Sequence, residues 1–571
     1  MIDVHTETQI HRQVVRKEAE IREIKIDPVV RLYYVEVEPP KMEDPTSDLR
    51  RLLKALEAEW ELQKIKVPHS ILEMLQPTLR EGKWKVTVAV DHDGIMRGIW
   101  SDFREHLYGI AVDIGSTTLA AHLCELGSGE VLSSAGMMNP QIRFGEDLMS
   151  RVSYVMLNQE GEKELTKSVR EALNQLSLEV CEQAGIQKEE VMEMVMVGNP
   201  VMHHLVHGIN PVELGGAPFA LATDEAIITP ASELDLQLHQ LARTYTLPCI
   251  AGHVGADTAA MVLAEAPHHQ EAITLLVDVG TNAEIVLGNR DRLLAASSPT
   301  GPAFEGAQIS SGQRAAPGAV ERVRIDPKTL EPRFRVIGSE CWSDDVSFAE
   351  ETKKTGVTGI CGSGIIEAIA ELYLCGIISQ DGLFDESMMG RSNRIIKEGR
   401  TCSYLLHKGE PELRITQNDI RAIQLAKAAL YAGIRLLMDH LGIEEVQRIR
   451  LAGAFGSHID VKYAMILGLI PDCDLDHVSS AGNAAGTGAR MALLNHESRR
   501  EIEETVREIE KVETAVEPAF QQHFVDAMAI PHKHAPSTHL QKTVSLPEAK
   551  NNAQGNGDST SRRRRSKRVV A

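Results

Sequence analysis

One ten-residue pattern occurs twice in this chain and constrains the fold more than any other feature. Residues 112–121 read VDIGSTTLAA, and residues 277–286 read VDVGTNAEIV. Each copy runs from apolar residues into an Asp, then through Gly and small polar residues into a second run of strand formers, which predicts a tight β-hairpin. Each copy also opens a long α/β stretch. We therefore expect two similar lobes that face one nucleotide.

Both predicted turns have the chemistry of an anion site. Glycine lets several backbone N–H groups point into one concavity, and hydroxyl side chains add donors. The preceding carboxylates suit Mg²⁺ held partly through water, so we expect Asp113 and Asp278 to be catalytic and to hold the metal in this way. A single copy would more often be a simple turn. The residues expected to bind phosphate are Gly115, Ser116, Thr117 and Thr118 in the first copy, and Gly280, Thr281 and Asn282 in the second.

A third stretch completes the set. Residues 449–457, IRLAGAFGS, read as a buried strand that runs into a Gly-rich turn. At these three stretches the sequence resembles the superfamily of acetate and sugar kinases, Hsp70 and actin. The resemblance implies an α/β fold with a two-lobed, duplicated ribonuclease H-like nucleotide-binding domain. It also implies that ATP is bound, with the adenosine held by Gly453, Ala454, Phe455 and Gly456.

Two further carboxylates are candidates for catalysis. Glu284 lies four residues after Gly280 on the outgoing strand, where it could accept a proton from water that attacks the γ-phosphate. An exposed strand Glu is the alternative. Asp257, in GHVGADTAA, could orient the water or the metal, or it could be a helix N-cap. The loop of residues 298–318 is rich in Gly, Ala, Ser and Pro, and we expect it to lie over the nucleotide or a partner.

The pattern of turns and charges divides the chain into segments. Asp44 and Pro45 predict the start of a helix, Asp93–Gly94 predicts a hairpin turn, and Thr416 with Asp419 predicts the cap of a long helix that Gly442 ends. The expected segments are a flexible N-terminal or linker segment (1–25), a small α/β middle domain for docking or spacing (26–107), lobe I (108–267), lobe II (273–496), a C-terminal helix and family end (501–532), and a disordered basic tail (533–571).

Composition excludes several function classes. The net charge of −21 argues against nucleic acid as the main partner, because phosphate contacts need a surplus of Lys and Arg. The first 25 residues are densely charged and do not resemble a signal peptide. The long uncharged stretch at residues 194–212 contains His, Asn, Pro and Gly and is not a membrane span. A cytoplasmic protein is expected.

The eight cysteines are widely separated in the sequence. The closest two, Cys361 and Cys375, are fourteen residues apart. Structural zinc and iron–sulfur sites usually take ligands from closely spaced pairs. We therefore expect no iron–sulfur cluster in this chain and interpret the cysteines as isolated buried thiols.

The stretches between the hairpins resemble one family within the superfamily. GNPVMHHL, GHVGADTAA, PTGPAFEGAQISSGQRAAPGA, GICGSGIIEAIAEL, ITQNDIRAIQLAKAALYAGI and LAGAFGSHID are together similar to the reductive activators of corrinoid proteins, over roughly residues 26–532. The resemblance implies ATP-dependent reduction of Co(II) to Co(I) on the corrinoid protein of a methyltransferase system. Members usually begin with a ferredoxin domain, whereas this sequence starts at the linker. A separate ferredoxin, or a shortened form of the protein, is expected.

Three other function classes stay open. A sugar or small-acid kinase would share the lobes. An activator of a radical dehydratase would place a four-iron cluster between two subunits, with Cys361 as the residue to suspect. A non-catalytic actin-like scaffold would keep the motifs without turnover. The sequence also leaves the oligomeric state open, with a homodimer as one option.

Overall fold

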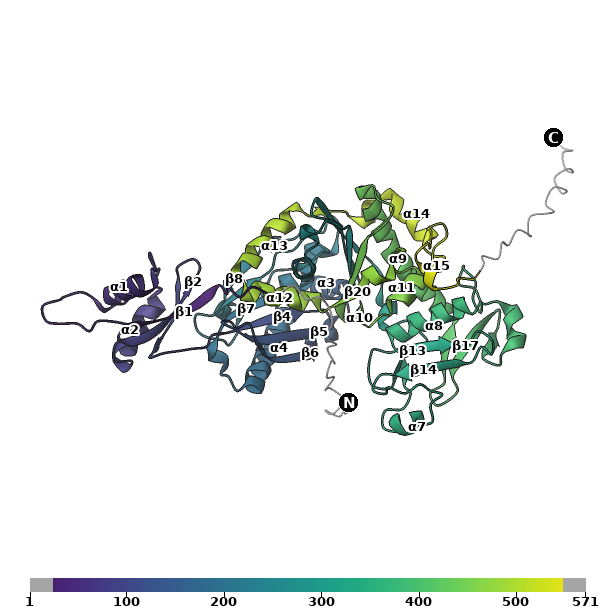
Figure 1. The fold of residues 1–571 in the computed structure, drawn as a ribbon, viewed down its shortest axis with the longest axis horizontal. Helices are drawn as coiled ribbons and strands as arrows, with labels where there is room; N and C mark the ends of the chain where they lie inside the picture. The colour runs from purple at the N-terminus through teal and green to yellow at the C-terminus, as the bar shows by residue number, and fades with distance from the viewer. Residues whose placement is uncertain (1–23, 457, 548–571) are drawn as a thin grey trace.

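The computed structural model describes residues 24–456 and 458–547. Residues 1–23 and 548–571, which hold most of the predicted N-terminal segment and of the predicted tail, and Ser457 lie outside this description. Figure 1 shows an elongated molecule in which a small N-terminal domain projects at one end and two large α/β regions follow.

The small domain has two helices and one antiparallel sheet in the order β1-β2-β3. The predicted turn at Asp93–Gly94 joins β2 to β3. The predicted helix start at Asp44 is wrong, because Ser47, not Asp44, accepts the capping hydrogen bond from the N–H of Arg50. The elements are β1 (Val30–Glu36), α1 (Asp48–Trp60), α2 (His69–Glu81), β2 (Lys85–Asp91) and β3 (Met96–Ser101).

Buried charges attach this domain to lobe I. Arg97 of β3 is only 3% exposed, and its guanidinium lies 3.3 Å from Asp91 and 3.6 Å from Glu193 of lobe I. It also donates to the carbonyl of Leu241 at 2.9 Å. The opposite side of Glu193 accepts from Arg499 at 2.9 Å. Because separating such pairs would leave charges buried without partners, the domain is fixed against lobe I.

Lobe I is built on a six-stranded mixed sheet in the order β6-β5-β4-β7-β9-β8. The pairs β6/β5, β5/β4 and β8/β9 are antiparallel, and the pairs β4/β7 and β7/β9 are parallel. Its strands are β4 (Tyr108–Ile114), β5 (Thr118–Glu125), β6 (Val131–Met138), β7 (Val191–Gly198), β8 (Ile227–Pro230) and β9 (Arg243–Thr246), and its helices are α3 (Leu148–Leu157), α4 (Gly161–Ala184), α5 (Pro200–His207) and α6 (Ala256–Glu265).

Lobe II repeats this plan. Its sheet has the order β20-β19-β10-β11-β12-β21, with antiparallel pairing from β10 to β12 and parallel pairing from β10 to β20. The order β6-β5-β4-β7-β9 in lobe I therefore matches β12-β11-β10-β19-β20 in lobe II, with the same pairing directions, and the predicted duplicated two-lobed α/β fold is confirmed. The strands are β10 (Thr274–Val279), β11 (Ala283–Asn289), β12 (Arg292–Ser298), β19 (Arg448–Ala452), β20 (Val478–Gly482) and β21 (Glu510–Lys511).

The lobes are joined by two helices that pack against each other. Helix α12 (Ala484–Leu494) follows the last large strand of lobe II, yet it packs on β4 and β7 of lobe I and on α6. The contact is close, because a Cβ added at Gly488 would lie 2.0 Å from the carbonyl oxygen of Ala260. Although the sequence order places α12 with lobe II, its packing places it at the junction of the lobes.

Lobe II also carries inserted and terminal elements. Its two small sheets have the orders β14-β13-β15 and β16-β17-β18. The predicted cap of the long helix is confirmed, since Thr416 and Asp419 form a capping box and Gly442 ends the helix at φ 68°. The elements are β13 (Ala319–Ile325), β14 (Pro332–Val336), α7 (Phe348–Glu351), β15 (Gly359–Ile360), α8 (Gly362–Leu374), β16 (Ile395–Glu398), β17 (Thr401–His407), β18 (Leu413–Thr416), α9 (Gln417–Leu441), α10 (Gly453–Gly456), α11 (Val461–Leu467), α13 (His496–Glu508), α14 (Pro518–Asp526) and α15 (Leu540–Thr543).

The C-terminal helix differs from the prediction. It begins at His496 instead of residue 501, because Asn495 accepts from the N–H of Ser498 at 2.9 Å and caps it. It ends at Glu508, after which β21 pairs with β12. Among the described residues, no helix is long and apolar enough to cross a bilayer.

Candidate functional site

The first candidate anion site is the turn between β4 and β5, Gly115 to Thr117. Its carbonyl groups are held from behind: Asn139 donates to the carbonyl of Gly115 at 2.9 Å, and Arg151 donates to that of Ser116. In a trans peptide the C=O and N–H groups point in opposite directions. The N–H groups of Ser116 and Thr117 therefore point away from Asn139 and Arg151. No backbone carbonyl of the described residues accepts from either one.

The second turn, Gly280 to Asn282 between β10 and β11, repeats this backbone arrangement with different supports. The hydroxyl of Thr300 donates to the carbonyls of Gly280 and Thr281 at 2.8 and 3.0 Å. The N–H of Gly301 also donates to Thr281, at 2.8 Å. The N–H groups of Thr281 and Asn282 consequently point the other way. Within the described chain, they too lack a backbone acceptor.

The loop predicted to lie over the nucleotide supplies these supports. Thr300 and Gly301 begin that loop, and Glu305, in the short helix η7 (Pro302–Glu305), accepts from the hydroxyl of Thr281 at 2.6 Å. The loop thus lies directly against the second turn. Whether it also covers a bound nucleotide stays a prediction.

Four predicted carboxylates gather beside the turns. Asp113 lies near the end of β4, and Asp278 lies in the corresponding place on β10. Glu284 is the register partner of Asp278 across the hairpin, so both side chains project from the same face of the sheet. Asp257 is in the first turn of α6. The N-cap interpretation of Asp257 is wrong, because Gly255 occupies that position. The Asp257 carboxylate instead accepts from the adjacent N–H of Thr258 at 2.8 Å and from the Thr258 hydroxyl at 3.5 Å.

The pKa values show that these carboxylates share one partly desolvated space. Burial, and then the charges of Asp257 and Asp278, raise the pKa of Asp113 to about 7. Burial and Asp257 raise the pKa of Asp278 to about 7, and burial raises the pKa of Asp257 to about 6. The pKa of Glu284 is raised well above its usual value by burial and by both Asp257 and Asp278. The ionised carboxylates therefore repel one another, and a cation bound among them would favour their ionised forms.

This donor set fits Mg²⁺ held through water. No Lys, Arg or His in the described ranges forms an ion pair with any of the four carboxylates, and hard oxygen donors are the ligands that Mg²⁺ prefers. The four carboxylates are too widely spaced for three of them to ligate one ion directly. The tight groups of three donors within 4.8 Å found among the described residues lie elsewhere, at Asp27–His92–His496 and His268–His269–Glu501. Bridging waters would span the wider spacing.

The third predicted stretch lies next to Asp278. Gly453 has φ 80°, and a Cβ added there would lie 2.1 Å from Oδ1 of Asp278, so only glycine fits beside this carboxylate. The Gly-rich turn predicted after the strand is one helical turn, α10, formed by Gly453 to Gly456. This short helix packs against β10 and β20. The side chains of Ala454 and Phe455 are outside the description.

Asn139, Arg151, Thr300 and Asn483 belong to the site but were not predicted from the sequence. Asn483 caps α12 by accepting from the N–H of Gly486 at 2.8 Å, and its side chain also hydrogen-bonds the Asp113 carboxylate, which lowers the pKa of Asp113. This contact joins the start of α12 to the end of β4 in lobe I. One signal was present in the sequence: Asn139 and Arg151 are the two ends of a polar stretch that follows the first hairpin.

The structure disfavours Cys361 as a ligand of a cluster shared between subunits. It lies at the start of α8, as the Gly-rich pattern predicts, but it is only 2% exposed. Its thiol donates to the carbonyl of Val320 at 3.2 Å. No tight group of three metal-binding side chains in the described part of the chain includes a cysteine.

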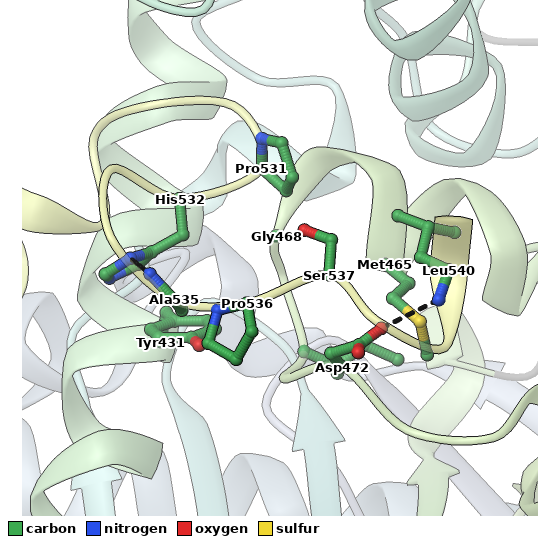
Figure 2. Close-up of a pocket in the computed structure, with 11 residues that line it drawn as sticks. Tyr431, Met465, Gly468, Asp472, Pro531, His532, Ala535, Pro536, Ser537 and Leu540 are labelled. Atoms are coloured by element: carbon green, nitrogen blue, oxygen red, sulfur yellow. Dashed lines mark hydrogen bonds between the residues drawn. The ribbon is translucent and has the colours of Figure 1, made fainter. Parts of the chain in front are cut away.

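A separate recess lies between α9, α11 and the C-terminal segment (Figure 2). Its volume of about 10 Å³ leaves room for about one water molecule. Asp472 in its wall accepts from the N–H groups of His539 and Leu540 at 2.7 and 2.9 Å. The recess is therefore a small gap where the C-terminal segment packs on α9 and α11, and not a ligand-binding pocket. It also shows that the predicted disordered tail, residues 533–571, is wrong for the part around residue 540, which Asp472 and the burial of Leu540 hold in place.

Comparison with known proteins identifies the family. Three family models match successive parts of the chain: the RACo linker region at residues 19–106, the RACo middle region at residues 108–270, and the C-terminal domain of RACo, the ASKHA domain, at residues 272–541.

Individual relatives agree. The corrinoid activation enzyme RamQ of Eubacterium limosum is 33% identical in an alignment of 521 residues, which covers 88% of this chain and 83% of RamQ. A [Co(II) methylated amine-specific corrinoid protein] reductase of Methanosarcina barkeri is 26% identical, covering 71% of this chain and 73% of that protein. The solved structure of a reductive activator for corrinoid, iron–sulfur protein superposes with a TM-score of 0.78 at 33% identity, covering 90% of this chain and 81% of that one. The chain belongs to the family of reductive activators of corrinoid proteins.

Proposed function

We propose that this protein uses ATP and Mg²⁺ to drive reduction of Co(II) to Co(I) in the cofactor of a methyltransferase corrinoid protein. The family assignment supports a corrinoid protein as the partner. The observation that carries the ATP-dependent part is the pair of turns with outward N–H groups beside four uncompensated carboxylates. An anion and a cation bound side by side, as in a metal–nucleotide complex, would satisfy both.

Each site residue has a proposed role. Asp113 and Asp278 would hold Mg²⁺ through water, and the metal would supply positive charge to the phosphates. The two turns would bind phosphate oxygens through their N–H and hydroxyl groups, and Gly453 to Gly456 would lie along the adenosine. Once bound Mg²⁺ favours the ionised form of Glu284, this residue, which faces Asp278 across the hairpin, would accept the proton of the attacking water, and Asp257 would orient that water.

A separate donor, such as a ferredoxin, would supply the electron. This rests on the spacing of the cysteines, because the closest two, Cys361 and Cys375, are fourteen residues apart and cluster ligands usually come from closely spaced pairs. Burial raises the pKa of the Cys249 thiol in particular, which keeps it protonated and inert.

Coupling would use the junction of the lobes. Co(II) in a corrinoid keeps an axial ligand, whereas Co(I) prefers none, so removal of the ligand favours reduction. A nucleotide can drive that removal only by binding two states of the activator with different affinity. The Asn483–Asp113 contact lies where α12 joins the lobes, so movement of one lobe would disturb the carboxylate cluster.

The test is an anaerobic assay with a Co(II) corrinoid protein, Mg-ATP and reduced ferredoxin or a chemical reductant. The protein should speed the appearance of the Co(I) absorption band, and omission of ATP or of the electron donor should abolish the effect. Several corrinoid partners should be tried, including one that carries methylamine-derived methyl groups. Equal Co(I) formation without the protein for every partner, or phosphorylation of a sugar or acid instead, would reject the proposal.

A further inference from the structure

The guanidinium behind the first turn is a buried cation without an anionic partner. Arg151, on α3, is fully buried. Its Nε donates to the carbonyl of Gly145 at 3.0 Å, and Nη1 lies 3.2 Å from Oε1 of Gln141 and 3.1 Å from the sulfur of Met202. Nη2 donates to the carbonyl of Ser116. All of these acceptors are neutral.

No carboxylate compensates this charge at contact distance. Among the described residues, none forms an ion pair with Arg151; Asp147, the N-cap of α3, acts on it only from a distance. Burial lowers the pKa of Arg151 to about 10, so it still carries its proton at neutral pH. A buried charge without a partner destabilises a protein unless an opposite charge approaches when the protein works.

The backbone transmits this charge to the open side of the turn. Arg151 polarises the peptide between Ser116 and Thr117 from its oxygen end, which makes the N–H of Thr117 a stronger donor. Asn139 fixes the preceding peptide in the same direction. The concave side of the turn therefore presents aligned donors with a full positive charge behind them, which is the arrangement that binds a tetrahedral oxyanion.

We infer that Arg151 is the built-in counter-charge of a phosphoryl group bound at the first turn, and that occupancy of this turn controls the stability of residues 140–157. This deepens the proposed function and rests on it. The linked segment comprises η2 (Pro140–Phe144) and α3. Gln141, Gly145 and Met202 all surround the same guanidinium. When the phosphoryl group leaves, the cation loses its close anion and this segment loses stability.

The test compares wild type, Arg151→Met and the control Arg143→Met, which replaces an exposed Arg of the same segment. Thermal unfolding is followed at pH 8 with increasing orthophosphate, against sodium chloride of equal ionic strength. Wild type and Arg143→Met should gain stability with orthophosphate. Arg151→Met should bind it about tenfold more weakly or worse. Without the anion, it should be at least as stable as wild type, because a buried unpaired charge has been removed.

A merely structural Arg would give a different result. Arg151→Met would then be destabilised with and without orthophosphate, and the gain on adding the anion would match that of wild type, which overturns the inference. If the variant fails to fold, hydrogen exchange of the wild type decides: orthophosphate should selectively protect residues 140–157, and no change there would refute the inference. An ATPase assay in parallel separates the two proposals. Wild type that binds orthophosphate through Arg151 but does not hydrolyse ATP contradicts the proposed function alone.

Discussion

The two hairpin turns have the same backbone plan but opposite electrostatic surroundings. In both, carbonyl groups are held from behind and the N–H groups point outward. The first turn is supported by the Arg151 cation and the Asn139 amide. The second is supported by the Thr300 hydroxyl, and Glu305 contacts Thr281.

From this difference we expect the two turns to bind different parts of one metal–nucleotide complex. Cationic support favours a phosphoryl group that is not neutralised by metal. Neutral support beside Asp278 and Glu284 favours the part of the nucleotide that carries Mg²⁺.

The largest effect should come from the carboxylates that face both turns. Asp113→Asn and Asp278→Asn should each lower ATPase turnover by about 100-fold or more, since both are expected to position Mg²⁺. Circular dichroism and the melting temperature should be unchanged or slightly improved, because each substitution relieves repulsion in the cluster. Unchanged turnover in both variants would remove this site as the place of hydrolysis.

Gly453→Ala should come next. The added methyl would meet Oδ1 of Asp278 and would have to adopt φ 80°, so we expect a loss of about 1 kcal/mol or more in the free energy of unfolding. Nucleotide hydrolysis should fall further than stability does, because Asp278 must move. Gly216→Ala is the control, as its added Cβ would meet no atom within 4 Å. Equal effects in both variants would contradict the close contact.

Mg²⁺ binding at the carboxylates and anion binding at the first turn should respond differently to pH. With pKa values near 7, Asp113 and Asp278 are largely protonated at pH 6 and ionised at pH 8, so protons compete with Mg²⁺ and its affinity should rise roughly tenfold over this range. Sulfate binding at the first turn should stay flat, since Arg151 keeps its proton. Calorimetric titration with each ion measures both. A flat Mg²⁺ affinity would indicate that the cluster is not the metal site.

Without Mg²⁺, the stability of the protein should change with pH in the opposite direction to the Mg²⁺ affinity. The raised pKa values mean that the native protein binds more protons than the unfolded chain between about pH 4 and 7. The free energy of unfolding should therefore fall as pH rises through this window, and fall less in Asp278→Asn. Chemical denaturation at several pH values, with and without Mg²⁺, tests this; a steeper fall in the variant would contradict it.

The smallest effect is expected at the second support. Thr300→Val removes the hydroxyl that donates to Gly280 and Thr281, and should weaken nucleotide binding by about fivefold, the value of one neutral hydrogen bond. Thr300→Ser should restore it. An effect as large as that of Arg151→Met would erase the proposed difference between the turns.

Local patterns in the sequence determined the elements that carry the site. The two hairpins with an Asp two residues before a Gly, the Thr416–Asp419 capping box and the helix end at Gly442 each depend on residues within a few positions of one another. Their conformations therefore follow from turn and cap chemistry. The duplicated order of strands followed from two copies of one such pattern.

Tertiary structure alone decided which side chains support the two turns and the carboxylates. Asn483 reaches Asp113 because α12 leaves its own sheet and packs across the lobes, and Thr300 reaches the second turn from the following loop. The pKa values of the carboxylates come from burial and mutual repulsion, which exist only once distant segments meet. Arg151 could have been a surface residue by sequence. Only the packing of α3 against α4 and η2, which brings its guanidinium beside Ser116 and Met202, removes it from water and leaves it without a counter-charge.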